Sequence, residues 1–555
     1  MTLRRKEILV YAVLLLLAFS FRFSLARFFP NDEPNDGKLY AQIARNVLEL
    51  HVYSHATEPP YDPSLIRLPG YPLLLAAVYS GFGHYNNTAV RVFQAVIDTA
   101  TCGLIALVAF LWEPDAKRKR RAAVAALALA TLCPFTAIYV ATILTETPTI
   151  FFAVAMTLTA TFAFQAKSGR QSIIFWSVTG VIAGIAVLFR PDSGLFAAAI
   201  GVTLVITTFL RPSTGRKEIG PWRGMARNAL PVAYLGVVFS AAFCLVLVPW
   251  TIRNERVFHL FQPLAPAHAE MPGEFVPRGY LAWLRTWLDD GRYIDPVLWS
   301  LDERPIKIDD FPERAFDSAA EKATVVALLE KYNHPPDSED PQAGSQAGSS
   351  DHSSDAEPSA TPEENAADES DETNSDSAGE GDESDLEDQS AATDEQNVEM
   401  TPDIDAGFAA LARARIARAP LRYYLRLPVK RAMSLWFDTH SQYYPFEGEL
   451  LPLSDLDHDI KQQYWLPLFA GLTWLYTLLG ILGGWFLWRS GQFAARRWLL
   501  LAVLMTLVRL AFFSTLENPE PRYVVEIFPF LAILGGIVLA RIPSLRRARL
   551  FKAKA

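Results

Sequence analysis

Asp36 is the first residue of this chain whose type and position suggest chemistry. It follows the first long apolar run, and Leu39, Ile43, Val47 and Leu50 then recur at helical spacing. Asp36 is therefore predicted to open an amphipathic helix beside a membrane span. An aspartate at that place has two interpretations. It either caps the helix by accepting free backbone N–H groups, or it acts on a substrate as a base or charge partner.

Other polar residues fall at the ends of further apolar runs. Glu146 opens one run, Arg190 and Arg253 follow two others, and the segment 517–523 precedes the last. Each residue alone is explained by a cap, a turn or an interfacial charge whose apolar stem lies along the membrane. Together they predict a polar site at the membrane boundary. Carboxylates there would accept protons, and the planar forks of arginines would bind phosphate.

The apolar runs that must position these residues predict the fold. The chain has 555 residues, of which 51% are hydrophobic, and its mean hydropathy is +0.14. Runs of about 20 apolar residues are long enough to cross a bilayer. We predict an all-α polytopic membrane protein with about ten transmembrane helices, amphipathic helices in its first outer loop and a second, large outer loop. The predicted spans are 7–25, 90–112, 122–141, 150–164, 173–189, 195–210, 229–248, 465–488, 498–513 and 527–540.

The distribution of Lys and Arg predicts the orientation of the spans. Basic residues gather in both terminal segments and in four loops, 113–121, 166–171, 211–227 and 489–497. With ten spans all of these segments fall on one side, which the positive-inside rule makes cytoplasmic. The first loop (27–88) and the long segment after Pro249 then lie outside. We predict an integral multi-pass protein of a bacterial inner membrane, with the N- and C-termini in the cytoplasm.

An acidic segment divides the chain. Residues 337–399 contain 22 Asp and Glu and no Lys or Arg, and without them the net charge changes from −9 to +13. A segment of this composition buries too little apolar surface to fold. We predict four parts: a membrane body with spans one to seven (1–334), a disordered insert (335–401), an interfacial outer segment (402–464), and spans eight to ten with a basic tail (465–555).

Several classes of function lack support in the sequence. It contains no Walker loop and no dinucleotide-binding glycine pattern, and its basic clusters have the distribution of cytoplasmic loops. Cys102, Cys133 and Cys244 fall inside apolar runs and suggest no disulfide or metal site. A transporter or flippase is the main alternative to an enzyme. Transporters place charges near the middle of the bilayer and have repeated halves. Here the charges gather at one face, with Arg509 as an exception, and no repeat is visible.

Six short motifs resemble those of the membrane-embedded GT-C glycosyltransferases, in particular the protein O-mannosyltransferases and the aminoarabinose transferases of lipid A. The first is an acidic residue four positions before a tyrosine in the first outer loop, Asp36 and Tyr40. The second is a proline-containing start of that loop's second helix (67–72), and the third is an acid that opens span four (Glu146). The fourth is Arg-Pro after span five (Arg190-Pro191). The last two are Pro-Trp followed by Arg-Asn at the end of span seven (249–254) and Arg-Tyr before the last span (Arg522-Tyr523).

This resemblance implies an enzyme that transfers a hexose or pentose from a polyprenyl-phosphate-linked donor to an acceptor on the non-cytoplasmic side, with inversion. It implies that Asp36 is the general base or orients the acceptor, and that Glu146 is a second carboxylate. The implied substrate contacts are Tyr40, Arg67, Arg190, Arg253, Arg522 and Tyr523.

The same resemblance implies the partners. They are the lipid-linked sugar donor, a glycolipid, polysaccharide or protein acceptor, and membrane lipids, without nucleic acid. No cofactor is required, and a divalent metal is neither required nor excluded. His51 and His55, four residues apart and near Asp62, could hold one only if they lay on a helix. Two positions depart from the related transferases. Arg67 stands before Pro69 where lysine is common, and the adjacent pair of acids found in protein O-mannosyltransferases is absent at Asp36-Gly37.

Overall fold

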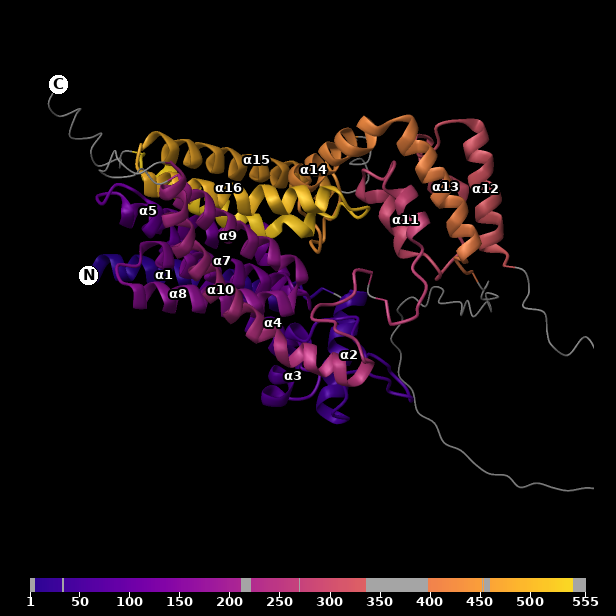
Figure 1. Ribbon diagram of the computed structural model, residues 1–555, viewed down its shortest axis with the longest axis horizontal. Helices are drawn as coiled ribbons and strands as arrows, with labels where there is room; N and C mark the ends of the chain where they lie inside the picture. Colours follow the sequence, from indigo (N-terminus) through magenta and orange to yellow (C-terminus); the bar gives the residue numbers. More distant parts are fainter. Residues whose placement is uncertain are drawn as a thin grey trace, which may run out of the picture.

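Every regular element in the described part of the chain is a helix (Figure 1). This computed structural model describes residues 5–31, 34–210, 221–268, 270–335, 398–451, 453 and 460–542, and only the backbone of 221–228. Nine of the described helices are long and apolar enough to cross a membrane, or ten if one bent pair counts as a single span. The predicted all-α polytopic architecture is confirmed. The predicted acidic insert lies almost wholly outside the described residues.

The long helices form one bundle, whose core is a large cluster of buried apolar side chains. The largest difference from the predicted spans is in the seventh, which continues as a helix through Pro249. The bundle helices are α1 (Arg5–Phe28), α4 (Asn87–Trp112), α5 (Lys119–Thr131) with the short α6 (Pro134–Ala137), α7 (Glu146–Gln165), α8 (Gly169–Phe189), α9 (Gly194–Phe209), α10 (Pro221–Phe258), α15 (Ile460–Arg489), α16 (Phe493–Ser514) and α17 (Phe528–Leu539).

The last helix, α17, packs closely against α5 and α15 through glycines. A Cβ atom on Gly483 of α15 would lie 2.3 Å from the carbonyl oxygen of Leu534. A Cβ atom on Gly536 of α17 would lie 2.6 Å from the carbonyl oxygen of Ala122. Small residues let membrane helices approach to this distance.

The third predicted span is broken. Helix α5 and the segment Pro134–Ala141, which contains α6 and a 3₁₀ helix, are bent by 55° relative to each other. The helix breaks here because Pro134 has no N–H to continue it. Arg22 of α1 donates hydrogen bonds to the carbonyls of Ala130 and Thr131 at the end of α5, at 3.0 and 3.2 Å. Arg22 also pairs with Asp98 of α4. This buried ion pair therefore stabilises the break, and the sequence analysis did not foresee it.

Two short helices form the first loop at one end of the bundle. They are α2 (Asn35–Glu49), which is amphipathic, and α3 (Gly70–Phe82), which is apolar and too short to count as a span. A Cβ atom on Gly70 would lie 2.6 Å from the carbonyl oxygen of Leu188, so the start of α3 touches the end of α8. This contact brings the loop before α3 against the turn between α8 and α9.

Replacement of Gly70 by alanine is expected to lower the free energy of unfolding by about 1–3 kcal/mol, because the added methyl group overpacks the contact with α8. Thermal unfolding of the purified protein in detergent measures the effect. Gly81→Ala is the matched control, since a Cβ atom at Gly81 of the same helix meets nothing within 4 Å and alanine favours a helix. Equal melting temperatures for the two variants would contradict the close approach.

A second, smaller core lies beyond that end of the bundle. It is formed by α11 (Arg278–Leu284), α12 (Ala319–Asn333) and α13 (Pro402–Arg418), with the rings of Trp283 and Phe408 5.1 Å apart. Segments 278–334 and 402–418, which the sequence places in different parts of the chain, pack together in this core.

The basic segment 413–431 contributes buried side chains to this outer region. Arg415 is buried and pairs with Glu321. Arg431, on α14 (Leu427–Phe437), donates to the carbonyls of Leu288 and Arg285, each at 2.7 Å. Two arginines of this basic segment, Arg415 and Arg431, thus make internal contacts.

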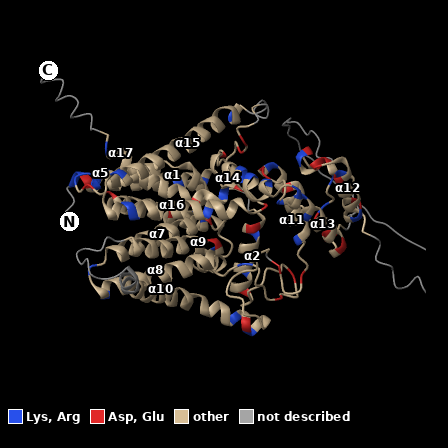
Figure 2. Ribbon diagram, turned by 45° about the horizontal axis from the view of Figure 1, so that its top comes forward, with Lys and Arg blue, Asp and Glu red and all other residues tan. Residues whose placement is uncertain are grey.

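Charged side chains occupy the ends of the bundle and the outer helices, while the middle of the bundle is mostly uncharged (Figure 2). The start of α1 lies at one end of the bundle, and α2, α3 and α11–α13 lie at the other (Figure 1). The predicted site residues can therefore be sought at the end that carries α2.

Candidate active site

A cavity of about 730 Å³ lies at the α2 end of the bundle. Its lining comes from α2, the loop before α3, the start of α7, the α8–α9 turn, the end of α16 and the segment before α17. Apolar side chains of α9 and α16, including Leu195, Phe512 and Phe513, line the cavity together with the charges. Seven of the eight predicted site residues line it: Asp36, Tyr40, Arg67, Glu146, Arg190, Arg522 and Tyr523.

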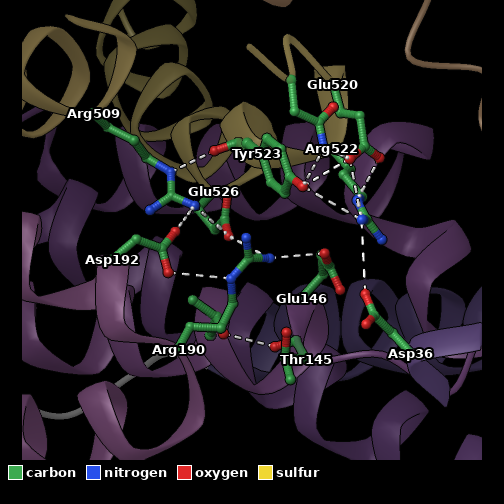
Figure 3. Close-up of polar contacts among 12 residues, drawn as sticks. Asp36, Thr145, Glu146, Arg190, Asp192, Arg509, Glu520, Arg522, Tyr523 and Glu526 are labelled. Carbon is green, nitrogen blue, oxygen red and sulfur yellow. Dashed lines mark hydrogen bonds and ion pairs between the residues drawn. The ribbon is translucent and has the colours of Figure 1, made fainter. Parts of the chain in front are cut away.

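Asp36 occupies the first turn of α2 but does not cap it. The N-cap residue is Pro34, and no side chain caps the helix. The Asp36 carboxylate instead accepts a hydrogen bond from Arg67 at 2.8 Å. It also lies 3.8 Å from Arg522 (Figure 3). The interpretation of Asp36 as an N-cap is therefore wrong. Its carboxylate lies between two arginines at the wall of the cavity.

The two arginines keep Asp36 ionised. Burial by itself raises the pKa of this carboxyl group, but the charges of Arg67 and Arg522 outweigh burial and hold the pKa below its ordinary value. Tyr40, one helical turn further along α2, stays neutral, because burial and the nearby Asp36 charge raise the pKa of its hydroxyl to about 12. Asp36 can accept a proton at neutral pH, whereas Tyr40 can donate a hydrogen bond.

Glu146 is the first residue of α7, where a negative charge is favoured by the helix dipole. Its side chain is 2% exposed, and its Oε1 accepts a hydrogen bond from Arg190 at 2.8 Å. Within the described residues, its second oxygen, Oε2, has no hydrogen-bond partner. A buried carboxylate oxygen without a partner is costly, so Glu146 has an acceptor free for a bound hydroxyl or ion.

Arg190 belongs to a buried group of charges that includes two acids overlooked in the sequence. Asp192 accepts from Arg190 at 3.2 Å and lies 2.7 Å from Arg509. Glu526 lies 2.8 Å from Arg509 and 3.7 Å from Arg190 (Figure 3). Arg509 and Glu526 are both fully buried. Arg509, the charge noted inside a span, is thus the central cation of a group that fixes Arg190.

The segment before α17 brings a third arginine to the cavity. Arg522 pairs with Glu520 at 2.6 Å, and the Tyr523 hydroxyl donates to the same glutamate at 2.7 Å. The Tyr523 backbone carbonyl accepts a hydrogen bond from Arg509 at 2.6 Å. The side chains of Arg522 and Tyr523 are therefore both held in place by Glu520.

Arg253 is the one predicted site residue outside the cavity lining. It donates to the carbonyls of Ser64 and Tyr53, at 2.8 and 3.4 Å, and its guanidinium lies over the Trp250 ring. Tyr53 in turn donates from its hydroxyl to the carbonyl of Arg67 at 3.1 Å. Arg253 therefore fastens the loop that carries Arg67 to α10, which is a positioning contact.

The outer core also reaches the cavity. Arg285, directly after α11, pairs with Glu517 at 2.5 Å, and both residues line the cavity together with His268 and Asn518. The sequence gives no local signal for this contact, because the two residues are more than 200 positions apart. The described residues contain no group of three or more His, Cys, Asp or Glu that could hold a metal ion.

Solved structures show only a general likeness to this chain. The archaeal oligosaccharyltransferase AglB of Archaeoglobus fulgidus, solved with an inhibitory peptide and a dolichol-phosphate, is 13% identical with a TM-score of 0.45. The comparison covers 98% of this chain but 51% of the archaeal one, so this chain spans about half of that protein's length. ArnT of Cupriavidus metallidurans, solved with undecaprenyl phosphate, is 14% identical with a TM-score of 0.35, covering 96% of this chain and 77% of that one.

The family comparison is more informative. No curated protein matches the sequence. Residues 62–250 match the model of the dolichyl-phosphate-mannose-protein mannosyltransferase family. This stretch includes Arg67, Glu146 and Arg190 of the cavity and ends at Trp250, beside Arg253. Over these residues the chain is similar to that mannosyltransferase family, in agreement with the resemblance to GT-C glycosyltransferases that its sequence motifs carry.

Proposed function

We propose that this protein is a glycosyltransferase that moves a hexose or pentose from a polyprenyl-phosphate donor to an acceptor on the non-cytoplasmic side of the membrane. The observation that carries the proposal is the position of Asp36. An ionised carboxylate lies between Arg67 and Arg522, in a cavity that also has apolar walls at the end of the bundle. Such a cavity suits a substrate with a charged head and a lipid tail.

The proposed reaction is a single displacement with inversion. Asp36 accepts the proton of an acceptor hydroxyl while that oxygen bonds to the anomeric carbon of the donor sugar. The bond between the anomeric carbon and the phosphate oxygen breaks, and the oxygen leaves with its electron pair on the polyprenyl phosphate. Arg67, Arg522 and Arg190 stabilise the charge that grows on this phosphate.

The ion pairs of the cavity fit this sequence of events. When the phosphate takes hydrogen bonds from Arg67, Asp36 loses its nearest cation, and its carboxylate becomes a stronger base. Glu146 uses its unpartnered oxygen to orient the acceptor hydroxyl or an ion. The acceptor is a glycolipid, a polysaccharide or a protein.

The direct test reconstitutes the purified protein in liposomes with a polyprenyl-phosphate hexose or pentose and each class of acceptor. Mass spectrometry measures release of free polyprenyl phosphate, and NMR measures the anomeric configuration of the product. We expect transfer with inversion from the lipid donor and none from a sugar nucleotide. Movement of lipid or solute across the liposome membrane without any sugar transfer would instead identify a transporter.

Replacement of Arg67 by glutamine is expected to change the pH dependence of transfer. Activity requires ionised Asp36, so it is lost as the pH falls through the pKa of that group. Without the Arg67 charge and its hydrogen bond, the effect of burial is opposed only by Arg522 and Arg190. The pKa of Asp36 therefore rises, which moves the acid limb of the rate profile to higher pH. The control is Arg45→Gln, which removes an exposed charge from α2, the helix that carries Asp36. It should leave the acid limb in place. An unshifted limb in Arg67→Gln would contradict the base role of Asp36.

A further inference from the structure

An apolar groove of about 700 Å³ lies among α14, α15, α16 and α17, on a different face of α16 from the candidate active site. Its floor includes Phe530 and Leu534 of α17, and its rim includes large exposed side chains such as Ile481 and Leu507. Among its lining residues the polar groups are two threonines. One of them, Thr477, is already bonded to Trp436. A groove with this lining suits a hydrocarbon chain.

The groove extends along the bundle from the end of α15 to α14. On α15 its lining runs from Thr477 to Trp488, and on α16 from Leu499 to Leu510. At 1.5 Å per residue each stretch is about 17 Å long, which is enough for an acyl chain that fills half of a ~30 Å hydrocarbon core. One end of the groove is lined by α14. Trp488 lies one residue before the end of α15, so the other end of the groove is at the end of the bundle opposite the candidate active site.

A second cavity, of about 500 Å³, continues the groove at this end. The two cavities share Trp485, and the second is also lined by Arg118, Arg489 and Arg541. Tryptophans at the end of a span mark the level of lipid headgroups. Asp115 also lines the second cavity and pairs with Arg118. An apolar groove thus adjoins a cavity lined by arginines at headgroup level.

Two arginines at this junction lack an acidic partner. Arg489 lies over the Trp485 ring at 5.1 Å, and Arg496 lies over the Trp488 ring at 4.9 Å. Neither makes an ion pair with any described carboxylate, whereas Arg541 is neutralised by Glu113 at 2.7 Å. A guanidinium held flat on an aromatic ring keeps its N–H edge free, and that edge matches a phosphate.

We propose that an anionic phospholipid binds here, with its acyl chains in the groove among α14–α17 and its phosphate between Arg489 and Arg496. The charge of the junction favours an anionic headgroup over a zwitterionic one. The position of the two arginines, at the end of the bundle opposite the candidate active site, favours a phospholipid over the proposed lipid donor. This site is independent of the proposed transferase chemistry, because it shares no residue with the cavity that holds Asp36.

Native mass spectrometry of the full-length protein in detergent tests the proposal, with phosphatidylglycerol and phosphatidylcholine added at equal concentration. The wild type should retain phosphatidylglycerol preferentially. The double variant Arg489→Gln/Arg496→Gln should reduce that preference roughly tenfold or more, since hydrogen bonds to charged groups contribute at least that factor. Arg170→Gln, which removes an exposed charge in the first turn of α8, should not change it.

A second variant tests the groove. Ala502→Trp fills the groove from α16 and should reduce retention of both lipids, whereas Leu482→Trp, on α15 outside the lining, should not. The proposal is overturned if the double arginine variant keeps the wild-type preference, if Arg170→Gln loses it equally, or if Ala502→Trp retains both lipids. Specific retention of polyprenyl phosphate in place of phosphatidylglycerol would also overturn it.

Discussion

Asp36→Asn is expected to reduce sugar transfer by a factor of about 10²–10⁴, because the asparagine amide cannot accept the proton of the acceptor hydroxyl. The side chain keeps nearly the same shape, and the Asp36 carboxylate is 34% exposed. An ion pair with this exposure contributes little to folding, so the variant should express and melt like the wild type. Donor turnover in liposomes and thermal unfolding of the same preparation measure the two effects.

The control for this prediction is Asp62→Asn. Asp62 is an exposed acid of the same first loop and is not part of the cavity lining, so its substitution should leave transfer unchanged. Binding of the donor to Asp36→Asn should persist, because the arginines that face the phosphate are intact. Full transfer activity in Asp36→Asn would show that Asp36 is not the general base, even though the protein is then a transferase.

Arg509→Gln is expected to be the most destabilising of the substitutions considered, at about 3–5 kcal/mol of unfolding free energy. Arg509 is fully buried, and its Nη2 lies 2.7 Å from Asp192 and 2.8 Å from Glu526. Without it, the carboxylates of Asp192, Glu526 and Glu146 share the single cation Arg190. The melting temperature in detergent should fall strongly, and transfer should fall with it because Arg190 loses its fixed position.

Two further variants separate this effect from a general loss of charge. Arg45→Gln removes one partner of an exposed pair with Glu49, and its effect should be within ~1 kcal/mol. Arg509→Gln/Glu526→Gln removes a buried acid together with its cation, so it should be more stable than Arg509→Gln alone. A double variant as unstable as the sum of the two single variants would contradict direct coupling between Arg509 and Glu526.

The helical spans and the gathering of polar residues at their ends follow from the sequence alone. Both depend on local properties: an apolar run of about 20 residues must cross the bilayer wherever it occurs, and charges at its ends stay near water. For this reason the all-α polytopic fold and the first-loop helices could be predicted, and seven of the eight predicted site residues line the cavity. The match of residues 62–250 to a transferase family agrees with the motifs on which the prediction rests.

Side-chain pairing could not be predicted in this way. The sequence does not show that Asp36 faces Arg67 and Arg522 instead of capping its own helix, or that Arg253 fastens a loop outside the cavity. It also does not show that Arg509 meets Asp192, more than 300 positions away. These contacts depend on how far each helix is rotated about its axis, and that rotation is set by packing against helices from distant parts of the chain. Only the tertiary structure therefore decided which charges became ion pairs of the site and which support it from outside.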